Sequence, residues 1–321
     1  MYRKLCHTAE RIEALLAQRR APARVVGGRV LPSFIELLLQ PSPTTRVGQI
    51  RALQADLALA LGNANLRVVQ SGARLALQIP RQARQPVRLS ALLARLGQLP
   101  PFTAVLGVAE DGAPLLAHLP SAEVAHILVA GTTGAGKTAL AHSILLSLAQ
   151  RQRPRELGVV MIDPKLHAEA VTEALRGHLL LPPARRPEQA QAALQRVVQV
   201  MEQRDLRHAP QPRIVVFVDE LADVCQSGGA AVSEPLARIA QRGREAGVHL
   251  LVCTQKPSAR AIGSLLKSNL PLRLVGRVVS AHDALLASGV AGSGAEKLLG
   301  SGDFLAVGGG TMTRFQAALP Q

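Results

Sequence analysis

The stretch from residue 126 to residue 140, HILVAGTTGAGKTAL, constrains the fold more than any other part of this chain. Four apolar residues lead into Gly131, and a loop of small residues leads out into the apolar residues that follow Thr138. A short apolar run bounded by glycine is typical of a buried strand. The stretch therefore predicts a strand, a phosphate-binding loop and a helix, in that order.

The loop matches the pattern G-x-x-x-x-G-K-[ST], and each part of the pattern has a mechanical reason. Glycine lets the backbone turn tightly and approach an anion, and the free amide groups at the start of a helix bind phosphate oxygens. We expect Lys137 to reach the β- and γ-phosphates of a nucleoside triphosphate, and the Thr138 hydroxyl to bind Mg²⁺. The predicted nucleotide-binding residues of the loop are Gly131, Thr132, Thr133, Gly134, Ala135, Gly136, Lys137 and Thr138.

Length and charge suggest two domains and a polyanionic partner. A chain of 321 residues exceeds one average domain and can bury a stable core. Its formal net charge of +15 comes almost entirely from arginine. Such a charge favours a nucleic-acid partner, although an arginine-rich genome would give the same composition. Aromatic residues make up 2% of the chain, which argues against base-stacking platforms for single strands and favours backbone contacts to a duplex.

Two further features favour a soluble cytoplasmic protein. The sequence contains no run of eighteen apolar residues, and charges lie near the start of the chain where a signal peptide needs an apolar core. We therefore expect no membrane segment in this chain. The cysteines have no metal-like spacing, and we expect reduced, buried thiols at Cys6, Cys225 and Cys253.

The sequence divides into three expected regions: a basic N-terminal arm at residues 1–22, a small α+β domain at residues 23–121, and a nucleotide-binding domain at residues 122–321. The arm has a short helical period, and either docks a partner or is a solvated helix. The expected elements of the small domain are a strand at 29–40, a helix at 45–61 capped by Thr45, strands at 66–70 and 74–79, a helix at 87–99 and a hairpin at 103–119.

The second half of the chain alternates strand and helix patterns. This alternation predicts an α/β domain whose mostly parallel sheet is covered on both faces. Ligands of such sheets bind beyond the carboxyl ends of the strands. The expected strands are 126–130, 158–163, 214–219, 249–254 and 272–279.

Polar residues follow three of these strands. Asp219 and Glu220 end the apolar run IVVFV, where one carboxylate is expected to hold Mg²⁺ and the next to orient and deprotonate the attacking water. Two carboxylates after an apolar strand are costly unless they serve a cation. Asp163 is expected to contact the nucleotide and Gln255 to sense its γ-phosphate. For both residues, a strand-end cap is the open alternative.

Several ordered blocks resemble the FtsK/SpoIIIE family of DNA translocases. The resemblance covers roughly residues 26 to 318, because the run RVLPSFIELLLQPSPTTRVGQIRALQADLALALG is also similar to the smaller domain that precedes the family's motor. The blocks of the motor are HILVAGTTGAGKT, MIDPK, MEQR, IVVFVDELAD, RIAQRGREAGVHLLVCTQKPS, LLKSNLPLRL and LLGSGDFL.

The resemblance implies a RecA-like motor domain that forms a hexameric homo-oligomeric ring around double-stranded DNA and moves along it by ATP hydrolysis. It implies that Lys137, Glu220 and Gln255 act in catalysis and that Thr138 and Asp219 hold the metal. Arg244, in QRGREAGVH, matches a family arginine that acts on a neighbouring subunit's nucleotide. Arg273 is the rival for that role.

The chain also departs from the family pattern. Full-length members carry a membrane anchor, a linker and a winged-helix module, none of which is visible here, and the segment 205–213 is short. Either an inter-subunit or DNA-facing feature is trimmed, or the chain belongs to a compact branch such as those on mobile elements. The leading interpretation is a compact ATP-driven translocase that moves chromosomal or mobile-element DNA. Two alternatives stay open: a conjugation-type coupling ATPase that delivers DNA to a secretion channel, and a nucleotide-switched DNA-binding scaffold. The presence of Glu220 argues against the scaffold, which would lack a catalytic carboxylate.

Overall fold

The chain folds into two compact units, Met1–Pro86 and Val87–Gln321. The boundary expected between residues 121 and 122 is therefore wrong, because the hairpin at 103–119 pairs into the sheet of the second unit. The computed structural model describes residues 2–31, 34–64, 66–71, 74–81, 86–165, 169–207 and 210–320.

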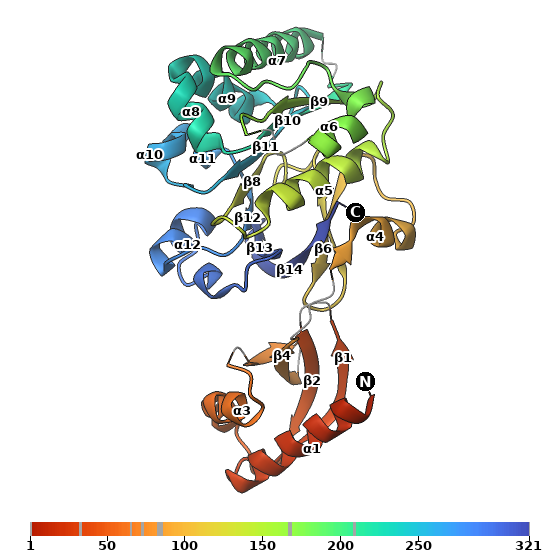
Figure 1. Cartoon of the computed structure of the whole chain (residues 1–321), viewed down its shortest axis with the longest axis vertical. Helices are drawn as coiled ribbons and strands as arrows, with labels where there is room; N and C mark the ends of the chain where they lie inside the picture. The colour runs from red at the N-terminus through yellow and green to blue at the C-terminus, as the bar shows by residue number, and fades with distance from the viewer. Residues whose placement is uncertain are drawn as a thin grey trace. The chain divides into compact units, whose positions relative to one another are not determined.

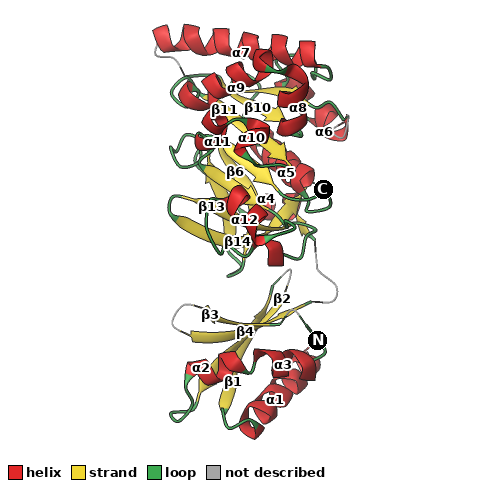
Figure 2. Ribbon diagram, turned by 90° about the vertical axis from the view of Figure 1, so that its left-hand side faces the viewer, coloured by secondary structure: helices red, strands yellow, loops and turns green. Residues whose placement is uncertain are grey.

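The first unit is an antiparallel sheet of four strands, in the order β1-β2-β4-β3, with its helices on one face (Figure 2). Leu37 and Leu39 of β2 and Leu75 and Leu77 of β4 point toward the helices, since alternate residues of a strand share a face. The elements are α1 (Tyr2–Gln18), β1 (Ala23–Val30), β2 (Phe34–Pro41), α2 (Val47–Ala52), α3 (Gln54–Ala60), β3 (Arg67–Ser71) and β4 (Arg74–Pro80).

The expected basic arm is part of this unit's core. Ile12 and Leu16 of α1 are buried in the same apolar cluster as the strands. The helix is therefore held by the burial of its apolar stripe rather than extended into solvent. The arm prediction failed because the sheet that covers this stripe lies elsewhere in the sequence.

Two other predictions for this unit were too coarse. The expected strand 29–40 covers the end of β1 and most of β2, which pair with each other, and residues 32–33 lie outside the described residues. The expected helix 45–61 is two helices that meet at Leu53. Thr45 does not cap it: Arg46 holds the cap position, and the Thr45 hydroxyl donates to the carbonyl of Pro22 at 2.8 Å.

The second unit is built on one mixed sheet with the strand order β7-β6-β14-β13-β12-β8-β11-β10-β9, and β5 pairs with β14. Its strands are β5 (Val87–Arg88), β6 (Thr103–Ala109), β7 (Pro114–His118), β8 (Ile127–Ala130), β9 (Leu157–Ile162), β10 (Arg213–Val218), β11 (Val248–Thr254), β12 (Leu272–Val275), β13 (Asp303–Gly308) and β14 (Thr311–Leu319). Its helices are α4 (Leu89–Arg95), α5 (Lys137–Ala149), α6 (Glu169–Ala174), η1 (Arg176–His178), α7 (Pro187–Arg207), α8 (Leu221–Gly228), α9 (Ala230–Arg242), α10 (Ala259–Ile262), α11 (Ser264–Ser268), α12 (Ala281–Ser288) and η2 (Ala295–Lys297).

The five strands from β12 to β9 run parallel, as expected, and are buried on both faces. Along β8, Ile127 and Val129 pack into one apolar core while Leu128 and Ala130 pack into the other. Figure 1 shows α4, α5 and α6 on one side of the sheet and α7, α8 and α9 on the other. The arrangement is that of an α/β domain whose parallel strands are covered by helices on both faces.

The remaining strands, from β13 to β7 in the strand order, are antiparallel, so the predicted parallel strands form one part of a mixed sheet. Strands β13, β14, β6 and β7 extend the sheet beyond β12 through antiparallel pairs. The hairpin predicted at 103–119 is confirmed, but the expected helix 87–99 begins as β5 and continues as the shorter α4. Both β5 and β6 pair with β14, which lies near the end of the sequence. Local sequence patterns do not indicate such distant partners.

Two simpler observations complete the fold. Within the described ranges, no helix is both long and apolar enough to cross a membrane. The cysteines differ in burial: Cys253 is buried, Cys225 is half-buried and Cys6 is exposed. Burial raises the pKa of the Cys225 thiol to about 11 and raises that of the Cys253 thiol well above its ordinary value, so both are protonated, unreactive thiols at neutral pH.

Candidate functional site

A cavity of about 320 Å³ lies at the carboxyl ends of the parallel strands. Strand β11 separates β8, which leads into the phosphate loop, from β10, which leads into the carboxylates. Three segments that are distant in sequence therefore converge at one edge. The cavity is lined by Thr133, Gly134, Gly136, Lys137, Thr138, Ala139, Lys165, Asp219, Glu220 and Gln255.

The phosphate loop has a fixed backbone. Gly136 caps α5 with φ of 100°, a conformation that favours glycine, and a Cβ atom there would lie 3.0 Å from the backbone nitrogen of Gly302. The Thr132 amide and hydroxyl both donate to the carbonyl of Arg277, at 2.8 and 3.0 Å, and the Gly302 amide donates to Ala135. The loop is therefore braced from outside its own motif, with helix amides available for an anion.

Lys137 points along this loop. Its side chain is buried, and Nζ donates to the carbonyl of Thr132 at 3.1 Å. Burial lowers the pKa of Lys137, while Asp219 and Glu220 act in the opposite direction. A triphosphate in the loop would supply anionic oxygens for this ammonium group, which now donates to a neutral carbonyl.

Thr138 and Asp219 supply the oxygens that a hard cation prefers. The Thr138 hydroxyl lies 3.5 Å from Oδ1 of Asp219, at the base of the cavity. Among the described residues there is no group of three or more His, Cys, Asp or Glu side chains that could hold a metal. Few protein ligands suit Mg²⁺, which usually takes one or two of them together with water and substrate phosphates. The residues present fit that cation.

Glu220 follows β10 in a strained conformation. Its φ of 56° is left-handed, which is rare for a residue with a side chain, and it precedes α8 as the cap residue. Its Oε1 accepts hydrogen bonds from the Thr254 hydroxyl at 3.0 Å and from the Gln255 amide at 3.1 Å. The end of β11 therefore holds the carboxylate in the cavity, at a place where it can orient a water molecule.

Gln255 and Asp163 have different surroundings. The Gln255 side chain faces the phosphate loop, and its Oε1 accepts a hydrogen bond from the Thr133 hydroxyl at 3.0 Å. Asp163 is buried, and its Oδ1 accepts from the amide of Lys165 at 3.1 Å. The residues that surround the cavity include Gln255 but not Asp163, whose contact with the Lys165 amide is typical of a turn at a strand end.

Lys165 lines the cavity, and no role for it was predicted from the sequence. Its Nζ lies 3.0 Å from Oδ2 of Asp223 on α8, and this hydrogen bond raises the pKa of the lysine. The block MIDPK could have indicated a role at this site, because its lysine lies three residues after the end of β9, at the edge of the sheet where ligands bind. This lysine supplies a second cation at a site for a multiply charged anion.

The two candidate arginines lie outside the cavity. Arg244 is in the turn between α9 and β11, at the amino ends of the parallel strands, and is exposed beside Glu245. Arg273 is half-buried within β12, and burial lowers its pKa. Neither is among the residues that line the cavity of its own chain.

A closed polar cluster lies at the amino ends of the same strands. His249 is fully buried, with Nδ1 2.9 Å from the carbonyl of Ala125 and Nε2 3.0 Å from Arg213. Because arginine only donates, Nε2 accepts and Nδ1 carries the proton. The buried His126 accepts from the amide of Leu250 through Nδ1. Burial, and to a smaller extent the neighbouring His249, lowers the pKa of His126 to about 3; burial lowers that of His249 to about 4.

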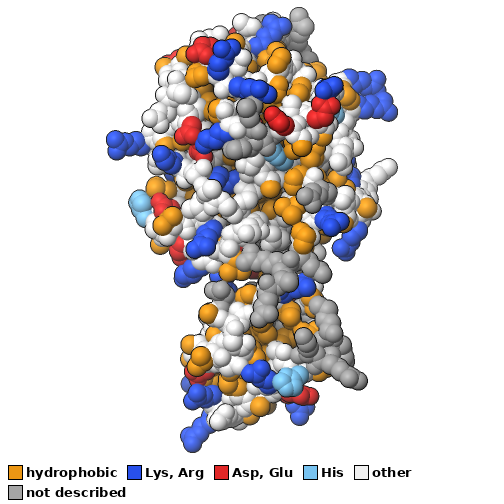
Figure 3. All heavy atoms as spheres, viewed as in Figure 1, with side chains coloured by type: hydrophobic (Ala, Val, Ile, Leu, Met, Phe, Trp, Pro, Cys, Tyr) orange, Lys and Arg blue, Asp and Glu red, His pale blue; other side chains and the backbone are white. Residues whose placement is uncertain are grey.

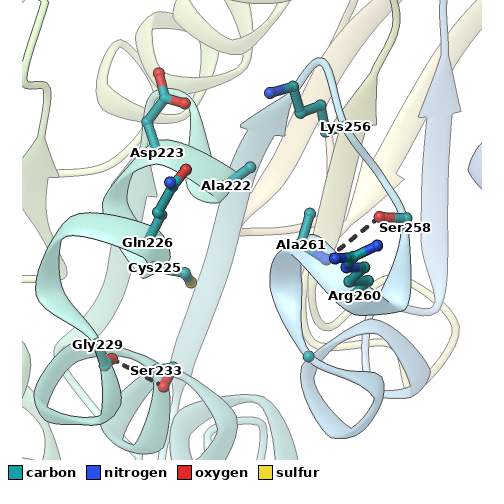
Figure 4. Close-up of a pocket in the computed structure, with 11 residues that line it drawn as sticks. Ala222, Asp223, Cys225, Gln226, Gly229, Ser233, Lys256, Ser258, Arg260 and Ala261 are labelled. Atoms are coloured by element: carbon teal, nitrogen blue, oxygen red, sulfur yellow. Dashed lines mark hydrogen bonds between the residues drawn. The ribbon is translucent and has the colours of Figure 1, made fainter.

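A second, larger cavity of about 570 Å³ lies between α8 and the loop that follows β11. Figure 4 shows Lys256, Ser258 and Arg260 on the loop side and Asp223 and Gln226 on the helix side. Both walls start at the first cavity, because α8 follows Glu220 and the loop follows Gln255.

Family models match both units. The model of the FtsK/SpoIIIE family matches residues 97–208 and 203–259, and that of the FtsK alpha domain matches residues 2–81. The chain is 33% identical to the DNA translocase FtsK of Sporosarcina ureae over 97% of its own length and 44% of the relative's. It is also 33% identical to DNA translocase FtsK of Mycobacterium tuberculosis over 97% of its length and 42% of that protein's. The chain therefore spans less than half of these relatives.

Solved structures share the fold. The conjugation coupling protein TcpA of pCW3, in its monomer form with ATPgS, has a TM-score of 0.65 at 17% identity and covers 98% of this chain and 96% of its own. The cytoplasmic domain of the type VII secretion ATPase EccC of Thermomonospora curvata has a TM-score of 0.62 at 23% identity and covers 73% of this chain and 32% of its own. At these identities the likeness shows the fold alone.

Proposed function

The chain belongs to the FtsK/SpoIIIE family, and from this premise we propose that it is the ATP-hydrolysing motor of a double-stranded DNA translocase that works as a ring of identical subunits in the cytoplasm. One observation carries the proposal: Lys137, Thr138, Asp219 and Glu220 line one cavity although they come from two separate segments of the chain. Their residue types match the parts that phosphoryl transfer requires.

Each residue has a distinct part in the proposed reaction. The loop amides and Lys137 bind the β- and γ-phosphates, and Thr138 and Asp219 hold Mg²⁺, which neutralises charge on those phosphates. Glu220 orients and deprotonates the attacking water. The Gln255 amide, opposite Thr133, contacts the γ-phosphate and changes partner when it leaves. Asp163 shapes the nucleotide side of the site through its contact with the backbone of Lys165.

The DNA contact in this proposal lies at the second cavity. Lys256 and Arg260 line one wall of it and offer cations for backbone phosphates. On the face in Figure 3, Lys and Arg side chains are scattered rather than gathered in one patch. Net charge alone therefore does not locate the DNA. A motor that moves along any sequence needs phosphate contacts, which carry no sequence information.

Ring assembly gives Arg244 its role. Arg244 is exposed and lies at the opposite edge of the parallel strands from its own nucleotide cavity, so it reaches phosphate only across a subunit interface. Mixing Arg244→Ala subunits with Glu220→Gln subunits tests this role, because each inactive partner supplies what the other lacks. Recovery of ATPase activity on mixing is the expected result. Equal recovery in mixtures of Arg273→Ala with Glu220→Gln subunits would favour the rival arginine.

The central experiment is steady-state ATPase activity with and without long double-stranded DNA at low salt. A large stimulation by duplex, absent in Glu220→Gln, is the expected result. A strand-displacement assay on a triplex then reports movement along the duplex. ATP binding without hydrolysis in the presence of duplex would contradict the motor and favour the nucleotide-switched scaffold.

A conjugation-type coupling ATPase remains the second candidate. It shares the site and the hydrolysis, and differs in the channel to which the DNA is delivered. A neighbouring gene for a relaxase would favour this role. The long match to FtsK translocases favours the first candidate.

A further inference from the structure

The strongest unassigned feature beside the catalytic site is a chain of hydrogen bonds through Thr254, the last residue of β11. Its side chain is fully buried, and its hydroxyl donates to Oε1 of Glu220 at 3.0 Å. The same hydroxyl accepts from the amide of Lys256 at 3.1 Å. The single hydroxyl therefore links the catalytic carboxylate to the loop that follows β11.

The backbone of Thr254 makes a third connection. Its carbonyl accepts from the amide of Gly131, the first residue of the phosphate loop, at 3.3 Å. Thr254 thus touches all three segments that form the site: the phosphate loop, the carboxylate segment and the loop with Lys256. Its position is fixed because β11 lies between β8 and β10 in the sheet.

Glu220 needs such support. Its left-handed backbone is costly for a residue with a side chain and persists only where surrounding contacts hold it. Its carboxylate accepts hydrogen bonds from the Thr254 hydroxyl and from the amide of Gln255, both at the end of β11. Removal of the Thr254 hydroxyl leaves the Gln255 amide as the remaining donor of these two. The Glu220 carboxylate is then less restricted in its orientation.

The second cavity gives this link a use. One wall is the loop with Lys256 and Arg260, and the backbone amide of Lys256 donates a hydrogen bond to the Thr254 hydroxyl. The other wall is α8, which follows directly after Glu220. A partner that binds in the cavity and displaces either wall changes the distance between the Thr254 hydroxyl and Oε1 of Glu220. The cavity walls and the carboxylate are therefore mechanically connected through one side chain.

We propose that Thr254 is a positioning residue that sets the catalytic geometry of Glu220 and couples it to the loop of residues 255–263. The inference rests on the proposed ATPase function and deepens it. Thr254 itself touches no reacting atom. Its hydroxyl aims the carboxylate, and its bond to the Lys256 amide transmits the state of the loop.

The test uses two variants of the full chain. Thr254→Val keeps the shape and removes the hydroxyl, and Thr254→Ser keeps the hydroxyl and removes the methyl group. We expect Thr254→Val to lower kcat about tenfold to a hundredfold, as loss of a hydrogen bond to a charged group implies. The Kd of a fluorescent ATP analogue should stay within about twofold of wild type, and Thr254→Ser should keep most of the wild-type kcat.

A matched control separates positioning from stability. Thr103→Val also removes a buried hydroxyl, one that lies 3.1 Å from Nδ1 of His118 on the antiparallel strands. We expect it to lower the melting temperature about as much as Thr254→Val does, with kcat unchanged. A Thr254→Val protein whose kcat falls no further than that of Thr103→Val would overturn the proposal, as would equal losses in Thr254→Val and Thr254→Ser.

Coupling has its own readout. We expect Thr254→Val to lose more of the duplex-stimulated rate than of the basal rate, since the loop acts through the missing hydroxyl. An equal fractional loss of both rates contradicts the coupling. An active wild type beside a fully active Thr254→Val contradicts only this inference, whereas a wild type that does not hydrolyse ATP contradicts the proposed function as well.

Discussion

The polar residues at the two ends of the parallel strands differ in their exposure to a ligand. At the carboxyl ends, Lys137, Asp219 and Glu220 line an open cavity with partners from different segments. At the amino ends, the buried His126 and His249 form a closed cluster with the half-buried Arg213. Both ends carry ionisable groups, and those of the open end are reachable by a ligand. An isolated polar residue beside an apolar strand is therefore weak evidence for a site until its neighbours are known.

The largest expected effect breaks the chemistry at the open end. Glu220→Gln keeps the size of the side chain and removes the base, so kcat should fall about a thousandfold, within the usual range for a general base, with nucleotide binding retained. Single-turnover hydrolysis and nucleotide binding measure the two effects. Glu173→Gln, at an exposed position, is the control and should behave like wild type. Normal turnover in Glu220→Gln would remove the residue from the mechanism.

A somewhat smaller effect concerns binding at the same end. Lys137→Ala removes the buried ammonium group from the loop, and the Kd for ATP should rise about a hundredfold, since loss of a buried charge contact costs a few kcal/mol. Equilibrium titration with a fluorescent nucleotide measures this change. Lys297→Ala, at an exposed position, should bind as wild type does. Unchanged affinity in Lys137→Ala would contradict the loop assignment.

The closed end should respond to acid. The pKa values of His126 and His249 are about 3 and about 4 in the folded chain, below the ordinary 6.5. The unfolded chain therefore binds more protons below pH 6.5, and stability is lost as the pH falls from 6.5 toward 4. As the pH falls from 7 to 5.5, the two histidines together should lower the free energy of unfolding by about 2 kcal/mol.

Denaturant unfolding at several pH values tests this loss. His126→Asn offers an oxygen to the amide of Leu250 without a titrating ring, so its stability should depend less on pH. His282→Ala removes an exposed histidine and should leave the dependence unchanged. Identical slopes for wild type and His126→Asn would show that this buried ring contributes nothing to the acid sensitivity.

The smallest effect concerns DNA at the second cavity. Removal of one phosphate contact by Arg260→Gln should reduce the slope of log affinity against log salt by about one, equally for all duplex sequences. Fluorescence anisotropy with two unrelated duplexes at several salt concentrations measures the slope. Arg176→Gln, on an exposed surface, is the control. A change confined to one duplex sequence would point to base contacts instead.

Much of the open end was predictable because its signals are local. The glycine pattern around Lys137 and the carboxylates after IVVFV follow from a few neighbouring residues. The positions of Thr138, Asp219 and Gln255 around one cavity agree with the predicted strand ends. The roles of Thr254 and Lys165 were not predictable, since each depends on a partner from another segment: Glu220 for the first and Asp223 for the second.

The same reason explains the errors in the fold. The arm at residues 1–22 has an apolar stripe, but the sheet that covers it comes later in the chain. The boundary between the units lies at residue 86 rather than at residue 121 because β6 pairs with β14 of the second unit. The paired residues, such as Ala109 and Phe315, lie about two hundred positions apart in the sequence. Local pattern indicates that a hairpin forms, and it does not indicate which sheet the hairpin joins.

The sequence by itself determined the phosphate loop, the run of parallel strands and the identities of the charged groups, because backbone sterics and apolar periodicity act over a few residues. Only the tertiary structure decided which groups meet. The Thr138 hydroxyl and Asp219 are 81 positions apart, and Thr254 and Glu220 are 34 apart. Strand order brings them within hydrogen-bonding range, and strand order is set by the burial of both faces of the sheet at once.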